Sequence, residues 1–371
     1  MQQRVVVVGG GFAGSSVARA LDEVADVVLV EPKDAFVYAA ATLRAVVDES
    51  WQKQVFYPYD HLLTRGRVVH DQARLVSPNL VRVSAHDALP ADYLVLATGT
   101  SYPFPARFLE NRAADAVAHL SRMREALARC ERVLLVGAGP VGLELAGELT
   151  SAFPGLAVTV VEQEPDILTT GDYLPELRHS VRHQLEKRGV TFVVGAPLGH
   201  LPPVDVGTYG QFTVETTTGA RVEAQMWFRC FGTRARTEYL DDELSVGLRH
   251  DGTIPVTQHL NVHGQRTVFA IGDTADIGEN KRISAARDHA TVVAQNITDL
   301  IEGREPSATY TPAPERIVLA LGPDAGAAQI TRDDGSRMVL GPRATSEIKG
   351  KDLSTYAMSR LFAGPQGIDV R

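Results

Sequence analysis

Cysteine is scarce in this chain of 371 residues. Only Cys130 and Cys230 are present, and they form no CxxC or CxxxxC pair. An enzyme that passes electrons through a redox disulfide needs two thiols close together in the fold, so the sequence argues against that route. No Cys/His pattern typical of a metal site occurs either, and no metal is expected. Because so few cysteines favour a reducing compartment, we expect a cytoplasmic protein.

Excess positive charge and long apolar runs are missing as well. The chain has 37 Lys and Arg against 45 Asp and Glu, a net charge of -8, which disfavours nucleic acid as a partner. No stretch approaches the roughly 20 apolar residues of a membrane-spanning helix. The apolar run at 5–8 is short and is followed by glycines, so we interpret it as a buried strand and not as a signal peptide. Any membrane contact is expected to be peripheral, at the cytoplasmic face.

Glycine, in contrast, is concentrated where the first apolar run ends, in "RVVVVGGGFAGSSVARAL" from Arg4. Gly9, Gly11 and Gly14 fit the pattern G-x-G-x-x-G between a strand and a helix, and Glu31 ends the next predicted strand. The first glycine permits a tight turn, the second lets a pyrophosphate approach the backbone, and the third allows close packing of helix on strand. The pattern therefore predicts a dinucleotide on the helix N-terminus, with Glu31 binding its ribose.

The same pattern occurs again in "VLLVGAGPVGLELAGEL" from Val133, where Gly137, Gly139 and Gly142 are followed by Glu162. Two complete copies predict two dinucleotide sites. A carboxylate at position 162 would repel a 2′-phosphate, which favours NADH over NADPH. The alternative is a solvated acid at a strand end.

We call the two strand–turn–helix segments, 4–21 and 133–149, the first and second glycine corners. Together with the strand end "LATGT" between them and "AIGDTAD" after them, they resemble the flavoproteins with two dinucleotide-binding domains, the pyridine nucleotide-disulfide oxidoreductase superfamily. The chain is similar to the branch of ferroptosis suppressor proteins and apoptosis-inducing factor homologues, close to type II NADH dehydrogenases. Segments that carry this similarity include "AATLRAVVDESWQKQVF", "GLELAGELTSAFPGLAVTVVE" and "KGKDL". The resemblance implies noncovalent FAD on the first corner, NADH or less favourably NADPH on the second, and a quinone as electron acceptor.

The expected fold class is α/β, with two Rossmann-like dinucleotide-binding domains and a small C-terminal α/β segment. We assign 1–107 and 250–305 to a discontinuous FAD-binding domain, 108–249 to an inserted NAD(P)H-binding domain, and 306–371 to the C-terminal segment.

The resemblance also assigns site residues by position. It implies FAD contacts from Gly9, Gly10, Gly11, Phe12, Ala13, Gly14, Glu31, Arg44, Val68, Thr98 and Asp273. It implies NADH contacts from Gly137, Gly139, Pro140, Val141, Gly142, Glu162 and Gly232. Glu144 matches an acid that lies beside the nicotinamide in type II dehydrogenases, and its alternative role is to stabilise a helix N-terminus.

The acceptor side is less well specified by the sequence. His289, on the helix that starts near the flavin, could relay a proton to a reduced quinone, or it could simply pack or face solvent. Tyr38, Trp51, Lys53 and Phe56 could line the acceptor side, although aromatic clusters are more often core. The chain departs from its relatives in carrying Thr274 for a common Cys and Ser354 for an aromatic, and it lacks the glutamine-rich quinone motif of type II dehydrogenases.

Two other functions are compatible with the sequence. One is an NADH-dependent reductase of a small iron-sulfur protein, which the acidic net charge disfavours because such partners are usually acidic. The other is a redox-sensing protein in which slow reduction of FAD by NADH changes conformation. The weakly amphipathic "KDLSTYAMSRLF" fits either a membrane interface or the contact of a homodimer.

Overall fold

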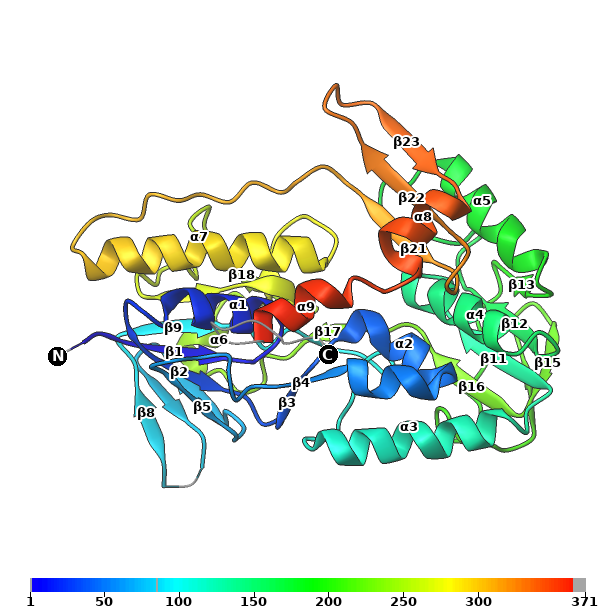
Figure 1. Ribbon diagram of the computed structural model, residues 1–371, viewed down its shortest axis with the longest axis horizontal. Helices are drawn as coiled ribbons and strands as arrows, with labels where there is room; N and C mark the ends of the chain where they lie inside the picture. The colour runs from blue at the N-terminus through cyan, green and yellow to red at the C-terminus, as the bar shows by residue number, and fades with distance from the viewer. Residues whose placement is uncertain (1, 85, 363–371) are drawn as a thin grey trace.

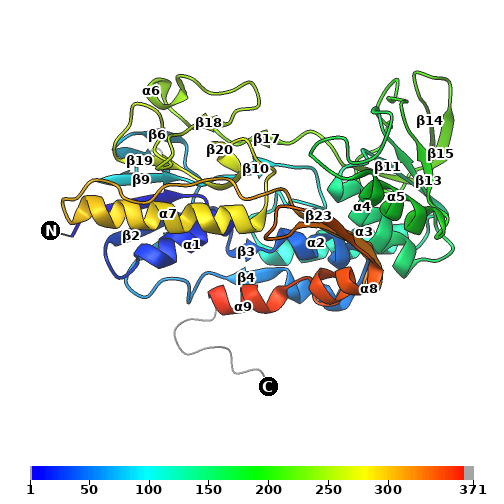
Figure 2. The ribbon, with the colours of Figure 1, turned by 90° about the horizontal axis from the view of Figure 1, so that it is seen from above.

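The computed structural model describes residues 2–84 and 86–362. Two parallel sheets lie side by side along the long axis of the molecule, each covered by helices, and a smaller C-terminal sheet lies over the second of them (Figure 1, Figure 2). The predicted α/β fold class is confirmed.

The first sheet has five parallel strands in the order β19, β9, β1, β2, β5. Their bounds are Val268–Ala270, Tyr93–Leu96, Arg4–Val8, Asp26–Val30 and Arg67–Val69. β19 joins this sheet although the whole second sheet precedes it in the chain, so the first domain is discontinuous. The residue numbers assigned to the domain boundaries stay a prediction.

Both faces of the first sheet are covered, which explains the unbroken apolar run of β1. Val5 and Val7 face the helices α1 (Phe12–Leu21) and α7 (Ile283–Ile301), which pack against each other on one side. Val6 and Val8 face the opposite core. An antiparallel meander contributes to this second core, and its strands are β6 (Leu75–Ser77), β7 (Leu80–Arg82) and β8 (Ala88–Pro90).

The second sheet has four parallel strands in the order β13, β12, β11, β16. Their bounds are Thr191–Val193, Ala157–Val161, Arg132–Val136 and Met226–Arg229. The helices of this domain are α3 (Ala113–Leu127), α4 (Pro140–Ala152) and α5 (Pro175–Glu186). The hairpin of β14 (Phe212–Glu215) and β15 (Arg221–Ala224) covers the face of β11 that bears Leu134 and Val136. The second unit thus repeats the strand–turn–helix plan of the first.

Shorter elements connect these units. They are β3 (Ala35–Val37), α2 (Ala39–Val47), β4 (Phe56–Pro58), β10 (Thr100–Ser101), β17 (Arg234–Ala235), α6 (Asp242–Ser245), β18 (Ile254–Pro255), β20 (Ala275–Asp276) and the 3₁₀ helices Glu49–Gln54 and Gly272–Thr274. β10 and β17 pair with each other, so the chain leaving the first sheet lies beside the chain returning from the second.

After α7 the chain runs as an extended strap, residues 304–316, back along that helix towards the second domain (Figure 1). It then forms an antiparallel sheet of β21 (Ile317–Ala320), β22 (Gly326–Thr331) and β23 (Arg337–Leu340). This sheet packs on α4 and α5. The strap contains no helix or strand, and hydrogen bonds to Asn296 and Arg282 of the α7 region hold it in place.

The chain then returns to the first domain through α8 (Pro342–Thr345), a π-helix (Ser346–Gly350) and α9 (Thr355–Phe362). The Phe362 ring of α9 lies among the aromatic rings of Phe36, Tyr57 and Tyr59. The amphipathic segment therefore buries its apolar side against the protein itself. Within the described ranges, no helix is long and apolar enough to cross a membrane.

The close approach of α4 to the C-terminal sheet depends on Gly147, because a Cβ there would overlap the backbone of Leu321. We predict that Gly147→Ala lowers the free energy of unfolding by about 1–3 kcal/mol, as overpacking does. Gly155→Ala is the matched control, since its Cβ would meet nothing within 4 Å. Urea unfolding of both variants checks this, and equal stabilities would show that the sheet is not packed against α4 as described.

Candidate functional site

Each of the two glycine corners has the backbone geometry that its first and third glycines were predicted to serve. Gly9 and Gly137 have φ angles of 104° and 109°, in the left-handed region that a side chain disfavours. A Cβ on Gly14 would overlap the Gly9 carbonyl oxygen, and a Cβ on Gly142 would overlap that of Gly137. The first turn of each helix can therefore pack against its strand only when both positions are glycine.

The second glycine of each corner borders open space. A Cβ on Gly11 or Gly139 would meet nothing within 4 Å. Each of these glycines precedes a helix whose N-terminus has no side-chain cap. The first N–H groups of a helix lack partners within it and attract anions. Room for a ligand and donors facing it fit a pyrophosphate at both corners. The first corner offers the N–H groups of Phe12 and Ala13, whereas at the second Pro140 has no N–H and Val141 supplies the first one.

The acid that follows each corner is fixed in the same way. One oxygen of Glu31 accepts a hydrogen bond from Gly10 N at 2.7 Å and the other from Lys33 N at 3.0 Å. Glu162 accepts from Ala138 N at 2.6 Å and from Glu164 N at 3.0 Å. Each carboxylate thus lies directly beside its glycine loop, where a ribose bound with the pyrophosphate would meet it. Val68, on β5, pairs with Leu29 of β2 near the same strand end.

Sequence reasoning missed one constraint at the first corner. The Tyr59 hydroxyl donates a hydrogen bond to Gly10 O at 2.8 Å, and a Cβ on Gly10 would lie 2.5 Å from that hydroxyl. Burial raises the pKa of Tyr59 well above its usual value, so the phenol keeps its proton. The middle glycine of "GGG" is therefore required by a tyrosine that arrives from a segment 49 positions later. The G-x-G-x-x-G pattern alone does not reveal this.

Asp273 lies at the carboxyl ends of the strands of the first sheet. Its carboxylate accepts a hydrogen bond from the Thr100 hydroxyl at 3.1 Å and lies 3.4 Å from the Arg107 guanidinium. Thr274, the residue that replaces a common Cys, accepts a hydrogen bond from Gly99 N at 2.7 Å. The Thr98 hydroxyl donates to Arg236 O at 2.6 Å, and a contact of Thr98 with FAD stays a prediction. The fold thus brings Asp273, which follows β19, next to the residues that follow β9, although the two strands are far apart in the sequence.

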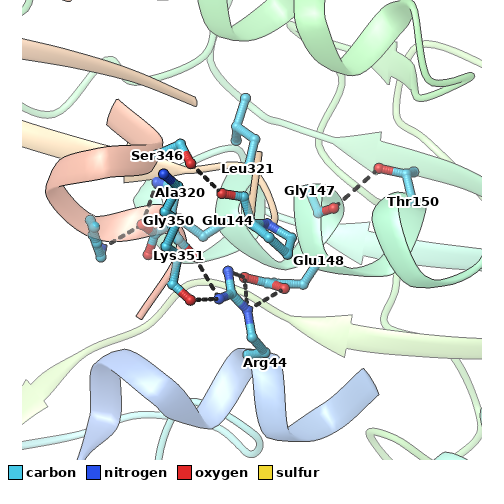
Figure 3. A network of polar contacts seen from close by, with 12 residues as sticks. Arg44, Glu144, Gly147, Glu148, Thr150, Ala320, Leu321, Ser346, Gly350 and Lys351 are labelled. Carbon is cyan, nitrogen blue, oxygen red and sulfur yellow. Dashed lines mark hydrogen bonds and ion pairs between the residues drawn. The ribbon is translucent and has the colours of Figure 1, made fainter. Parts of the chain in front are cut away.

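Arg44 is buried between the two domains, and its guanidinium lies within an ion pair. Nη2 lies 2.8 Å from Oε1 of Glu148 on α4, and Nη1 donates to Gly350 O at 2.6 Å (Figure 3). The side chains of Arg44 and Glu148 are only 3% and 5% exposed. The guanidinium also lies 4.9 Å from the centre of the Trp51 ring. Arg44 thus joins the two domains through an ion pair, and its contact with the flavin stays a prediction.

Glu144 lies one turn before Glu148 on the same face of α4 and meets the C-terminal segment. Its Oε1 accepts hydrogen bonds from Lys349 Nζ at 2.6 Å and from Ala320 N at 3.0 Å. Two acids four residues apart repel each other on a helix, and here Lys349 and Arg44 neutralise one each. Burial raises the pKa of Glu148, and the Arg44 guanidinium opposes that rise.

His289 was predicted to relay protons, and the structure engages both of its ring nitrogens inside the protein. Nδ1 lies 3.0 Å from Gly272 N, and Nε2 lies 3.0 Å from Glu279 Oε1. The ring is 2% exposed. Burial lowers the pKa of His289, and the Glu279 carboxylate opposes that shift. Both ring nitrogens are engaged within the protein, and proton transfer from His289 to a reduced quinone stays a prediction.

Among the residues predicted to line the acceptor side, Tyr38 belongs to the main apolar core, and Trp51 and Phe56 pack against that core. Tyr38 donates its hydroxyl to Leu353 O, Phe56 packs on Phe108, and Lys53 is exposed. Leu353 and Ser354 have φ angles of 50° and 57°, rare for residues with side chains and typical of functional sites. Gly232, at the end of β16, has φ 85°, and a Cβ there would approach the Arg229 guanidinium to 2.7 Å.

Both cysteines are free thiols. Cys230 is buried beneath the second corner, where a Cβ added to Gly142 would lie 3.2 Å from the Cβ of Cys230. Burial raises the pKa of Cys130 to about 11 and that of Cys230 to about 12. Neither is a thiolate at neutral pH, so neither is poised for disulfide exchange. In the described part of the chain no three His, Cys, Asp or Glu side chains could hold a metal ion.

Comparison with known proteins identifies this arrangement. The model of the pyridine nucleotide-disulphide oxidoreductases matches residues 3–292. The chain belongs to the pyridine nucleotide-disulphide oxidoreductase family. The family is FAD-dependent and uses NAD(P)H, so the chain is an oxidoreductase of the FAD/NAD(P) type.

Two curated relatives match most of the chain. It is 30% identical to ferroptosis suppressor protein 1 of Homo sapiens, over 88% of this chain and 88% of that protein. It is 28% identical to apoptosis-inducing factor homolog A of Dictyostelium discoideum, over 98% and 93%. Among solved structures, the sulfide:quinone oxidoreductase of Aquifex aeolicus aligns with a TM-score of 0.75 at 16% identity, over 98% and 92%. The last likeness shows the fold alone, and the family predicted from the sequence is confirmed.

The buried ion pair allows a quantitative prediction. Arg44→Met should lower the free energy of unfolding by about 3–5 kcal/mol, because it leaves the Glu148 charge buried without its partner. Arg44→Met/Glu148→Leu should recover most of that loss. Arg343→Ala is the control, since the exposed Arg343–Glu347 pair should contribute at most about 0.5 kcal/mol. Chemical denaturation measures all three, and a single variant as stable as the control would contradict a shared buried pair.

Proposed function

We propose that the protein oxidises NADH on its second corner, reduces FAD held on its first corner, and delivers the electrons directly to a quinone. The observation that carries this proposal is the presence of two open glycine corners, each with its anchored acid, in a chain whose two thiols are apart and protonated. Direct delivery follows because a chain without a dithiol has no intermediate electron carrier among its side chains.

The residues that would hold FAD surround the first corner. Gly11 leaves room for the pyrophosphate, Glu31 would bind the adenosine ribose, and Asp273 lies where the ribityl chain would pass. When bound, FAD supplies the chemistry that no side chain here provides, by accepting a hydride and releasing electrons. The protein contributes by holding donor and acceptor in register and by excluding water.

The second corner would hold NADH in a matching way, through Gly139, Val141 and Glu162. The Glu162 carboxylate, fixed beside the loop by two backbone N–H groups, would accept hydrogen bonds from both hydroxyls of the adenosine ribose. It would repel the extra phosphate of NADPH. Glu144 lies on α4, the helix that leaves this corner, and Lys349 neutralises its charge.

The choice of nucleotide gives a matched pair of variants. Glu162→Ala should shift the ratio of kcat/KM for NADH over NADPH towards NADPH by at least about tenfold, because like charges facing each other cost several kcal/mol. Glu164→Ala changes the next exposed acid and should leave the ratio as it is. Initial rates with both nucleotides give the ratio, and an unchanged ratio in Glu162→Ala would rule out nucleotide discrimination by this acid.

The absence of a dithiol route gives a second prediction. Cys130→Ala/Cys230→Ala should keep the quinone-dependent kcat of the wild type, because neither thiol carries electrons. Steady-state oxidation of NADH with a soluble quinone measures this, with thermal unfolding as the control for the buried Cys230 site. A stable double variant that has lost turnover would show that a thiol takes part.

The acceptor itself is tested with the FAD-loaded wild type and a panel of acceptors. We expect NADH to bleach the flavin absorbance and quinones to sustain NADH oxidation. If an oxidised iron-sulfur protein sustains NADH oxidation and no quinone does, the quinone is not the acceptor and the iron-sulfur protein takes its place. Protein that neither carries nor binds FAD would overturn the whole proposal.

A further inference from the structure

A continuous hydrogen-bonded chain connects the strap to the backbone that precedes Asp273. The Tyr310 hydroxyl donates to both carboxylate oxygens of Glu279, at 2.9 and 2.8 Å. His289 Nε2 lies 3.0 Å from Glu279 Oε1, and its Nδ1 lies 3.0 Å from Gly272 N. The side chains of His289 and Glu279 are 3% and 6% exposed, so water does not compete for these bonds.

The chemistry of the groups fixes the direction of every bond in this chain. A backbone N–H can only donate, so Gly272 donates to Nδ1, which must be unprotonated. The ring proton therefore sits on Nε2 and is donated to the Glu279 carboxylate. Burial lowers the pKa of His289, which keeps the ring neutral and this tautomer in place. The Tyr310 ring packs edge-on against the imidazole, with 4.3 Å between the ring centres, and so holds its plane.

The far end of the hydrogen-bonded chain fixes the Ile271–Gly272 peptide, one residue before Asp273. Gly272 has φ 66°, a left-handed conformation that does not by itself specify where the next side chain points. The bond from Gly272 N to His289 holds the Ile271–Gly272 peptide in one orientation and so restricts that freedom. Asp273 then meets Thr100 and Arg107 at the strand ends, and Lys281 Nζ donates to its carbonyl oxygen at 2.7 Å.

The other end of the hydrogen-bonded chain is Tyr310, which lies on the strap that leads to the second domain. The strap is tied to α7 where Asn296 exchanges two hydrogen bonds with the backbone of Ala308. Further along, the Arg282 guanidinium donates to the carbonyls of Ala313 and Pro314. The strap continues directly into β21, which packs on α4, the helix of the second corner (Figure 1). Tyr310 therefore joins the strap, which reaches the second corner, to Glu279 and His289, which lie beside the backbone before Asp273.

We propose that His289 is a positioning residue, which Glu279 and Tyr310 lock in one tautomer so that it fixes the Ile271–Gly272 peptide and thereby places Asp273 to bind FAD. Retention of FAD then depends on the docked strap through Tyr310. The inference rests on the proposed function for the identity of the ligand at the first corner, and it gives His289 a role other than proton transfer to an acceptor.

The tests use affinity for FAD and the state of the imidazole, and not activity. FAD is titrated into apoprotein and followed by quenching of its fluorescence, for the wild type, His289→Ala and His289→Asn. The Asn Oδ1 can take the place of Nδ1 as acceptor for Gly272 N. We expect His289→Ala to weaken FAD binding about tenfold, the scale of one lost buried hydrogen bond, and His289→Asn to restore most of the affinity. Equal weakening in both variants would overturn the proposal.

Two further measurements keep the proposal testable if His289→Ala does not fold. Nitrogen-15 NMR of labelled histidine should show His289 as the Nε2–H tautomer, and an Nδ1–H form would overturn the inference. Tyr310→Phe should weaken FAD binding, whereas Tyr209→Phe, at a tyrosine with 41% exposure, should not, and equal affinities would remove the strap from the mechanism. Protein that shows this pattern of affinities yet reduces no quinone would support the positioning role and overturn only the proposed acceptor.

Discussion

The buried ion pair between Arg44 and Glu148 constrains the relation between the two dinucleotide corners. It joins α2 of the first domain to α4, the helix that begins at the second corner, and Gly350 adds the C-terminal segment. Two charges withdrawn from water must stay paired, because separating them would leave a buried charge uncompensated. The domains are thereby held in one relative placement. Hydride transfer between two bound rings tolerates little misplacement, so the enzyme needs this rigidity.

The C-terminal segment supports both corners from outside. Its sheet packs on α4, Lys349 neutralises Glu144, and α9 returns to the first domain, where Phe362 packs against the tyrosine that orders Gly10. The strap meets the buried chain that leads to Asp273. The C-terminal segment therefore contacts elements of both corners and holds them in position.

Local sequence signals predicted the parts of the site that depend on neighbours along the chain. The glycine spacing and the strand-end acids follow from backbone geometry, so Gly9, Gly137, Glu31 and Glu162 could be placed from the pattern. Partners brought together by the fold could not. Nothing in the sequence around Arg44 indicates Glu148 as its partner. The engagement of both nitrogens of His289 depends on Gly272 and Glu279, and nothing in the sequence indicates that Tyr310 of the strap would meet Glu279.

Electron flow is tested most directly by anaerobic double-mixing stopped flow on the FAD-loaded protein. One equivalent of NADH is mixed first, the flavin is allowed to reduce, and a soluble quinone is added in the second mix. Direct transfer predicts that oxidised flavin absorbance returns at a rate at least as fast as steady-state turnover. A reduced flavin that persists after quinone is added would contradict it, and would favour a redox-sensing protein that NADH switches and no quinone discharges.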